Sequence, residues 1–283
     1  MRGRRAAQST IGDNALDDVL DVEDFTTNLI ELQKLAKMFT LVSSEIGVDT
    51  LKSLATAHPH SYSNLRMLRF LRKSKSRNIN SAATRFVNCV KWRDEWSVDG
   101  LLSPDDMRLP SKTFQEIQGM FNVVVENTEG ETTTIVLSAD QWDTQGLMRA
   151  LNDEETLSLD DFLLYWVSKY ETIHKMLYAR SLESGKLEYA NLRCTLKDLR
   201  LSQFSRSFVN EVLPLWLEIT QSYYPETSKR IYFVDPPKII MTVWKVVGRF
   251  VKKGTKEKVV MVKEEDVRGG ITTKKMIIKI EER

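Results

Sequence analysis

Apolar helices and short apolar strands alternate in the last third of the chain. A helical pattern over residues 202–222 precedes the strand IYFV (231–234), and a second helical pattern over 238–251 precedes the strand KVVMV (258–262). Strands that alternate with helices in this way are typical of parallel strands joined by crossover helices. We therefore expect an α/β fold with a mostly parallel sheet flanked by helices.

The first hundred residues predict a small helical bundle instead. Apolar residues recur at helical spacing between residues 15 and 46, within LRMLRFLRK (65–73), and over about 17 residues from Ile79 onward. Asn78 or Asn80 can cap the start of the last helix. This part of the chain shows no strand pattern, so we expect it to form a helical segment ahead of the sheet.

These patterns predict three segments. Residues 1–14 are expected to be disordered, residues 15–105 to form the helical segment, and residues 106–283 to form the sheet-containing domain. Two further stretches read as strands of that domain, namely NLRCTLKDL (191–199) and MIIKI (276–280).

Three local signals add detail to the sheet-containing domain. Apolar stretches on both sides of the turn signal NTEG (127–130) predict a β-hairpin. Residues 157–178 predict a long helix whose start carries Ser158 and Asp161 at capping-box spacing. Pro214 lies within the 202–222 pattern, where it must remove a hydrogen bond and kink the helix.

The charge distribution bears on possible partners. The chain of 283 residues carries 41 basic and 39 acidic residues, so the whole molecule is not a polycation and we expect no nucleic-acid partner. Residues 245–283, however, contain twelve basic and six acidic residues. Such a basic region suits an anionic surface such as phospholipid headgroups, and the alternative is a solvated face with scattered lysines.

No motif of enzyme chemistry is present in the sequence. There is no G-x-S-x-G elbow, no P-loop and no G-x-G-x-x-G stretch, and the carboxylates occur as adjacent pairs that cannot share a helix face. His58 and His60 flank a proline in an expected loop without further metal ligands. The two cysteines, Cys89 and Cys194, lie within periodic segments and predict buried, reduced thiols. We expect neither an enzyme nor a metal or cofactor site.

Several motifs in order resemble the CRAL-TRIO lipid-binding family. LRFLRKSKSRN…WRDEW (68–96) is similar to its N-terminal helical segment, and CTLKDL (194–199) is similar to its strand that ends in D-L. SYYPE (222–226) begins its most distinctive block, in which an apolar strand, a proline-containing turn, an apolar helix and T-x-x-K follow. The resemblance covers about residues 62–262, and the phosphatidylinositol transfer proteins look like the closest group.

The resemblance implies a hydrophobic lipid pocket and a set of site residues. Headgroup contacts are implied for Lys75, Glu226, Thr255 and Lys258, with Thr195 as a further ligand-binding residue on the central strand. A gate or pocket lining is implied for Tyr223, Tyr224, Val243, Trp244, Val247 and Phe250. The chain departs from the family at Ser74, where an arginine is usual, and at Arg193, a buried arginine where phosphatidylcholine-binding members carry a serine.

Each of these residues also has a simpler interpretation. Glu226 can pair with Lys229 or Arg230 at the surface, the two tyrosines can pack a helix end, and the helix over 238–251 can be a buried core helix rather than a lid.

The function that the resemblance implies is binding of phospholipid, specifically phosphatidylinositol, and its transfer or presentation between membranes. Burial of acyl chains contributes about 0.8 kcal/mol per CH₂, so an apolar cavity alone gives a large driving force. We expect a cytoplasmic monomer that visits membranes transiently and needs no cofactor. The alternatives are a lipid sensor that docks on membranes without transfer, and a carrier of a sterol, tocopherol or retinoid.

Overall fold

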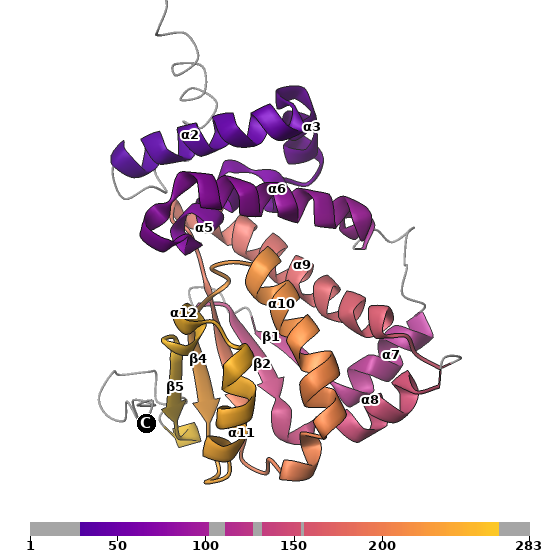
Figure 1. Ribbon diagram of the computed structural model, residues 1–283. Helices are drawn as coiled ribbons and strands as arrows, with labels where there is room; N and C mark the ends of the chain where they lie inside the picture. Colours follow the sequence, from indigo (N-terminus) through magenta and orange to yellow (C-terminus); the bar gives the residue numbers. More distant parts are fainter. Residues whose placement is uncertain (1–28, 102–110, 127–131, 154–155, 266–283) are drawn as a thin grey trace, which may run out of the picture. The chain divides into compact units, whose positions relative to one another are not determined.

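The structure, a computed structural model, describes residues 29–101, 111–126, 132–153 and 156–265 (Figure 1). The expected disordered N-terminus, the NTEG turn, the strand at 276–280 and the expected segment boundary near residue 105 lie outside these residues.

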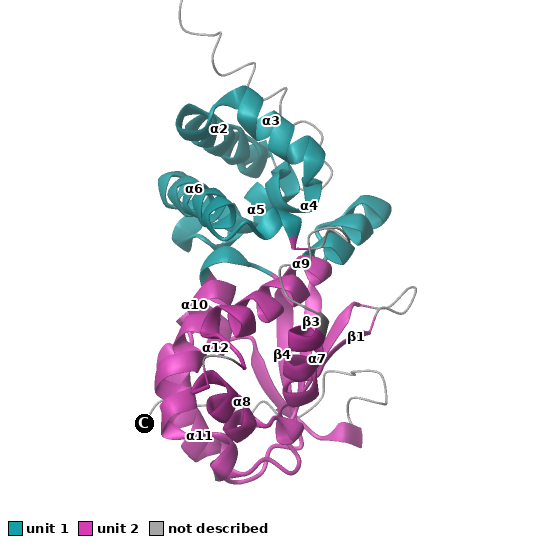
Figure 2. Cartoon of the chain, turned by 90° about the vertical axis from the view of Figure 1, so that its right-hand side faces the viewer, with its two compact units in different colours: residues 1–100, 174–188, 222–226 teal, residues 101–173, 189–221, 227–283 magenta. Residues whose placement is uncertain are grey.

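The chain forms two compact units (Figure 2). The first, the helical unit, comprises residues 1–100, 174–188 and 222–226. The second, the sheet unit, comprises residues 101–173, 189–221 and 227–283. The helical unit therefore takes two short segments from later parts of the sequence as well as the N-terminal helices.

The helices of the helical unit range from three to 18 residues, and a side-chain cap marks the start of α6. Asn78 caps the helix from Ile79, as predicted, because its side chain accepts a hydrogen bond from the Ser81 amide at 2.9 Å. His58 and His60 were expected in a loop, but they lie at the start of a four-residue helix. The helices are α2 (Leu29–Ile46), α3 (Val48–Ala57), α4 (Pro59–Tyr62), α5 (Asn64–Lys73), the 3₁₀ turn η2 (Lys75–Arg77), α6 (Ile79–Glu95) and η3 (Val98–Gly100).

The core of the helical unit lies between α2, α5 and α6. Leu35 and Val42 of α2 are fully buried with Phe70 of α5, and the ring of Phe70 meets Phe86 of α6 edge-on at 5.3 Å. Such apolar burial supplies most of the stability of a small bundle.

The sheet unit contains five strands in the order β1-β2-β3-β4-β5. The strand β1 pairs antiparallel with β2, which confirms the predicted hairpin, and the pairs β2–β3, β3–β4 and β4–β5 are parallel, which confirms the predicted mostly parallel sheet. The strands are β1 (Val123–Glu126), β2 (Thr134–Ser138), β3 (Ala190–Thr195), β4 (Ser228–Val234) and β5 (Val259–Val262).

Helices connect the parallel strands and cover the sheet. The crossovers β3–α10–β4 and β4–α11–β5 advance in one direction, so right-handed connections place both helices on one side of the sheet, as Figure 2 shows. The remaining elements are α7 (Ser111–Met120), η4 (Ala139–Gln141), α8 (Thr144–Leu151), α9 (Leu159–Ser184), η5 (Leu201–Gln203), the π-helical turn η6 (Phe208–Val212), α10 (Leu213–Tyr223), α11 (Ile240–Val247), η7 (Gly248–Phe250) and α12 (Lys253–Lys256).

The capping box at the start of α9 forms as predicted. The Ser158 hydroxyl accepts from the Asp161 amide at 3.1 Å, and the Asp161 carboxylate accepts from the Ser158 amide at 3.1 Å. The helix continues to Ser184, six residues beyond the predicted end. Indole and phenyl rings on α9 and α10 join in the core of the sheet unit, where Trp166 stacks on Trp216 with ring centroids 4.3 Å apart.

Pro214 interrupts the predicted 202–222 helix more strongly than a kink. The chain forms a 3₁₀ turn, a π-helical turn over Phe208–Val212 and only then the regular helix α10. Proline has no N–H and clashes with the carbonyl of the preceding turn, and a widened turn relieves both constraints. Similarly, the predicted lid helix over 238–251 shortens to α11 with the 3₁₀ turn η7 after it.

Candidate functional site

Two buried arginines of α5 hold the turn that carries Glu226. The Arg66 guanidinium donates from Nη2 to the Tyr223 carbonyl at 2.6 Å and also contacts the His174 ring. One helical turn later, Arg69 donates to the Glu226 carbonyl at 2.7 Å. Glu226 has φ +53°, an unusual value for a residue other than glycine, so the turn is a constrained one.

The side-chain environment of this turn decides between the earlier interpretations. Lys229 and Arg230 are exposed, and neither takes part in the ion pairs formed by the described residues. Tyr223 stacks on Trp92 at 4.1 Å, and the ring of Tyr224 lies edge-on to the same indole at 6.2 Å. Both tyrosines therefore pack within the helical unit, as the helix-end interpretation expected.

Lys75 lies in the 3₁₀ turn η2 and is exposed. The turn is unusual because Ser76 and Arg77 both have positive φ, at 54° and 50°. Ser74, which replaces the family's usual arginine, is buried and donates its hydroxyl to the Phe70 carbonyl at 3.0 Å. Ser74 thus caps the C-terminus of α5 with a buried hydroxyl. A long cationic side chain at this position would have to extend out of the core.

A fully buried carboxylate holds both ends of the Lys75 turn. Glu31 of α2 accepts from Arg72 at 2.8 and 3.1 Å and from Arg77 at 3.1 Å. The sequence analysis missed this cluster, because Glu31 is the last of seven acidic residues between residues 12 and 31 and nothing sets it apart from them. The one available signal was that Glu31 lies one helical turn before Leu35, on the apolar face of the predicted helix. A single sequence does not show which acidic residue is buried.

Thr255 lies in α12 and Lys258 lies directly before the first residue of β5, and both are half-buried. The Lys258 ammonium donates to the Ser228 carbonyl at 2.8 Å, at the first residue of β4 and two residues after Glu226 in the chain. Gln221 of α10 fixes the segment before α12, since its side chain donates to the Phe250 carbonyl at 3.1 Å and accepts from the Lys252 amide at 2.7 Å.

The helix α11 is neither fully buried nor fully exposed. Val243 is buried and Trp244 meets Phe233 of β4 edge-on at 5.5 Å, whereas Met241 and Val246 are each 40% exposed. Val247 and Phe250 are half-buried. The interpretation of this segment as a buried core helix is therefore wrong: it is a surface helix that covers the sheet with one face and shows apolar side chains on the other.

The register of β3 separates Thr195 from the lid residues. Cys194 pairs with Phe233 of β4, the residue that contacts Trp244, so Cys194 lies on the sheet face that α11 covers. Side chains alternate along a strand, which places Arg193 and Thr195 on the opposite face. Arg193 was expected to be a buried arginine, but its side chain is 22% exposed and pairs with Glu264 at 2.6 Å.

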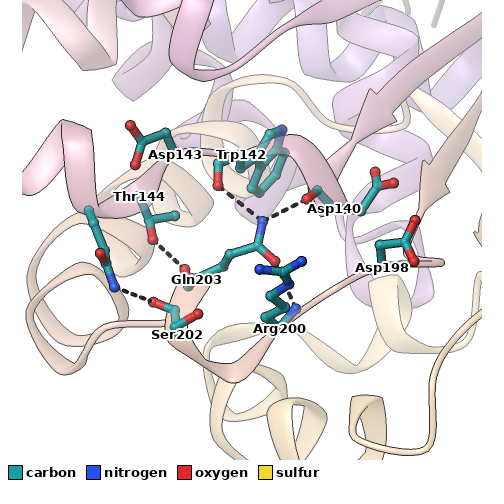
Figure 3. A pocket seen from close by; sticks show the side chains of 9 residues that line it. Asp140, Trp142, Asp143, Thr144, Asp198, Arg200, Ser202 and Gln203 are labelled. Carbon is teal, nitrogen blue, oxygen red and sulfur yellow. Dashed lines mark hydrogen bonds between the residues drawn. The ribbon is translucent and has the colours of Figure 1, made fainter.

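A polar pocket of about 260 Å³ opens where β2 and β3 end (Figure 3). The Gln203 amide crosses it and donates to the carbonyls of Asp140 at 2.8 Å and Trp142 at 3.1 Å, and Thr144 donates to the Gln203 carbonyl at 2.5 Å. Burial raises the pKa of the Asp140 carboxyl, one of whose oxygens has no hydrogen-bond partner among the described residues. With its polar lining and small volume, this pocket is unsuited to acyl chains, and ligand pockets typically occupy about 300–1,000 Å³.

A helical unit and a mostly parallel sheet whose crossover helices α10 and α11 lie on one side define the class of this protein as α/β. No described helix is long and apolar enough to cross a membrane. The chain belongs to the CRAL/TRIO domain family, whose model matches residues 124–279.

Similar proteins agree with this assignment. Protein real-time from Aedes aegypti is 23% identical over 192 residues, which is 68% of this chain and 28% of that protein. The chain thus spans about a quarter to a third of the length of the first curated relatives that it matches. Phosphatidylinositol transfer protein SFH5 from Cryptococcus neoformans var. neoformans serotype D is 22% identical, over 82% of this chain and 78% of that protein. The crystal structure of Sfh5 matches 83% of this chain with a TM-score of 0.60 at 15% identity, which shows the same fold.

Proposed function

We propose that this protein binds a phospholipid, phosphatidylinositol, and transfers or presents it between membranes as a monomer at the cytoplasmic side of membranes. The acyl chains would lie in an apolar cavity of the sheet unit, and the headgroup would meet Lys75, Glu226, Thr255 and Lys258. Lysine provides a point charge for phosphate, and carboxylate and hydroxyl groups bind inositol hydroxyls.

The observation that carries this proposal is the position of Lys258. Its ammonium is already held on the Ser228 carbonyl at the start of β4, and the half-buried Thr255 lies one turn earlier. A cation held in a fixed position suits a phosphate ester better than it suits a neutral sterol or retinoid. The similarity to a phosphatidylinositol transfer protein over most of both chains supports the same ligand class.

Mass spectrometry of the organic extract of purified protein tests the proposal. Near-stoichiometric phosphatidylinositol is expected, together with uptake of labelled phosphatidylinositol from vesicles. A different hydrophobic molecule in the extract would reject the headgroup roles. Folded protein that contains no lipid and takes up none would reject lipid carriage.

The exposed apolar side of α11 favours a second function, docking on membranes without transfer. Met241 and Val246 are exposed beside the exposed Lys245, a combination that suits an anionic lipid surface. This function predicts salt-sensitive sedimentation with vesicles of phosphatidylserine and phosphatidylcholine that survives Lys258→Ala. Absence of binding at low salt would refute it.

A further inference from the structure

We propose that Arg69 and Glu31 are positioning residues that hold Glu226 and Lys75, respectively, at fixed places beside α5. The two headgroup residues of the helical unit would then be presented to the ligand as a preformed pair. The inference rests on the proposed function, because it concerns the same headgroup site.

The contacts of Arg69 connect three segments of the helical unit. Its side chain is only 4% exposed, and it donates from Nη1 to the Glu226 carbonyl and from Nη2 to the Glu188 carbonyl, each at 2.7 Å. The flat guanidinium fork suits two acceptors at once, whereas a lysine ammonium at the same place is a single compact charge without that fixed geometry.

The backbone of Glu226 needs such support. A residue other than glycine at φ +53° adopts a sparsely populated conformation that persists only where surrounding contacts impose it. This φ sets the direction in which the Cα–Cβ bond of Glu226 leaves the backbone, so the Arg69 hydrogen bond to its carbonyl helps to hold the base of this side chain in place. The role of Arg69 is therefore exerted through the backbone of the turn and requires no contact with the ligand.

Glu31 acts on the other headgroup residue in the same way. Its carboxylate is fully buried and binds Arg72, three residues before Lys75, and Arg77, two residues after it. The turn between these arginines contains two consecutive residues at positive φ. One buried carboxylate thus holds a constrained turn from both sides, while Lys75 itself stays exposed.

Arg69 and Arg72, the latter a partner of Glu31, belong to the same helix. Arg69 and Arg72 lie on consecutive turns of α5, and Lys75 follows the helix end by two residues. Preformed contacts spare the ligand the cost of ordering each side chain, so removing one anchor should weaken phosphatidylinositol binding about 2–10-fold. Phosphatidylcholine, which has no inositol hydroxyls, should be affected much less.

The test compares Arg69→Lys and Glu31→Gln with Arg93→Lys as a matched control. Arg93 is also a buried arginine of the helical unit, and its partners are the Asp99 carboxylate and the Tyr62 hydroxyl. Transfer of labelled phosphatidylinositol and phosphatidylcholine between vesicles is measured for each variant and normalised to the folded fraction. We expect the phosphatidylinositol preference to fall about 2–10-fold in the two anchor variants and to stay unchanged in Arg93→Lys.

An equal decrease for both lipids in the anchor variants, as from lowered stability, would overturn the inference. If the unmodified protein prefers neither lipid, the proposed headgroup site is refuted. Amide hydrogen exchange then tests separately whether Arg69 and Glu31 hold the two turns in place. Exchange should rise in residues 222–228 for Arg69→Lys and in residues 74–81 for Glu31→Gln, but in neither segment for Arg93→Lys. Unchanged exchange in the anchor variants would refute the positioning roles.

Discussion

Replacing Lys258 with alanine is expected to lower the transfer of phosphatidylinositol strongly and the free energy of unfolding only slightly. The Lys258 ammonium donates to the Ser228 carbonyl at 2.8 Å, and this hydrogen bond fixes the position of the charge at the start of β4. An ammonium acts as a compact point charge, so it attracts a phosphate group from the place where it is already held. The proposed headgroup role of Lys258 therefore requires no rearrangement of this side chain.

The expected size of the effect follows from the interaction that the variant removes. A hydrogen bond to a charged group contributes about 1.5–3 kcal/mol, which corresponds to about 10–150-fold in affinity. Lys258 is only half-buried, so solvent screens its charge and the lower end, about 10-fold, is expected. Without the hydrogen bond to Ser228, the free energy of unfolding should fall by about 1 kcal/mol.

The assay is transfer of labelled phosphatidylinositol and phosphatidylcholine between vesicles, with Lys253→Ala as the control. Lys253 begins the short helix α12, five residues before Lys258, and is exposed, so its removal changes the net charge equally and leaves the Ser228 hydrogen bond in place. We expect about a tenfold decrease of phosphatidylinositol transfer in Lys258→Ala, with phosphatidylcholine and the control nearly unchanged. Equal decreases for both lipids, or equal effects of both variants, would refute the reasoning.

Three further predictions concern the folded state. Asp99→Asn leaves the buried Arg93 without its anionic partner and should lower the free energy of unfolding by about 3 kcal/mol in urea titrations; a change below about 1 kcal/mol would mean that the pair acts as an exposed one. Burial raises the pKa of the Cys194 thiol to about 12, so Ellman's reagent at pH 8 should label it only after unfolding, and rapid labelling of native protein would contradict this. Burial also raises the pKa of the Asp140 carboxyl, so the charged form of this group opposes folding as pH rises through that pKa. Asp140→Asn should therefore raise the melting temperature at pH 7, with a gain that shrinks below about pH 4. A gain that is the same at every pH would show that the charge of Asp140 is not its cause.

Local patterns were sufficient to predict most elements of the fold. The Asn78 cap and the Ser158–Asp161 capping box depend on residues three apart, and both form as expected. The hairpin and the parallel strands follow from the spacing of apolar stretches and of the helices between them. These features depend on neighbours in sequence, which a single chain displays.

Element boundaries depended on tertiary contacts that sequence patterns do not display. The long helix α9 continues to Ser184 because its later turns join the helical unit, whereas the earlier turns belong to the sheet unit. The predicted end at residue 178 followed the apolar stripe of the earlier turns, whereas the last turns of α9 carry the buried polar Ser181 and the exposed Leu182.

The supporting residues of the candidate site could not be predicted for a related reason. Arg66 and Arg69 lie beside the apolar edge of a short helix, and both are buried because backbone carbonyls far away in sequence accept their hydrogen bonds. Carbonyl acceptors exist at every residue, so the sequence carries no mark of which ones an arginine will meet. Glu31 is a similar case, since its hydrogen-bond partner Arg72 lies 41 residues away in the chain.

The separation of Arg193 from the lid shows what a strand pattern does and does not determine. Alternation requires Arg193 and Thr195 to share a face and Cys194 to take the other, and this much is readable from the sequence. Which face receives α11 depends on the handedness of the crossover and on the contact between Trp244 and Phe233. Because that contact lies on the side of Cys194, the charge of Arg193 has a protein partner in Glu264 and requires no lipid phosphate. The departure from the serine of phosphatidylcholine-binding members is thus accounted for within the protein by the pair of Arg193 with Glu264.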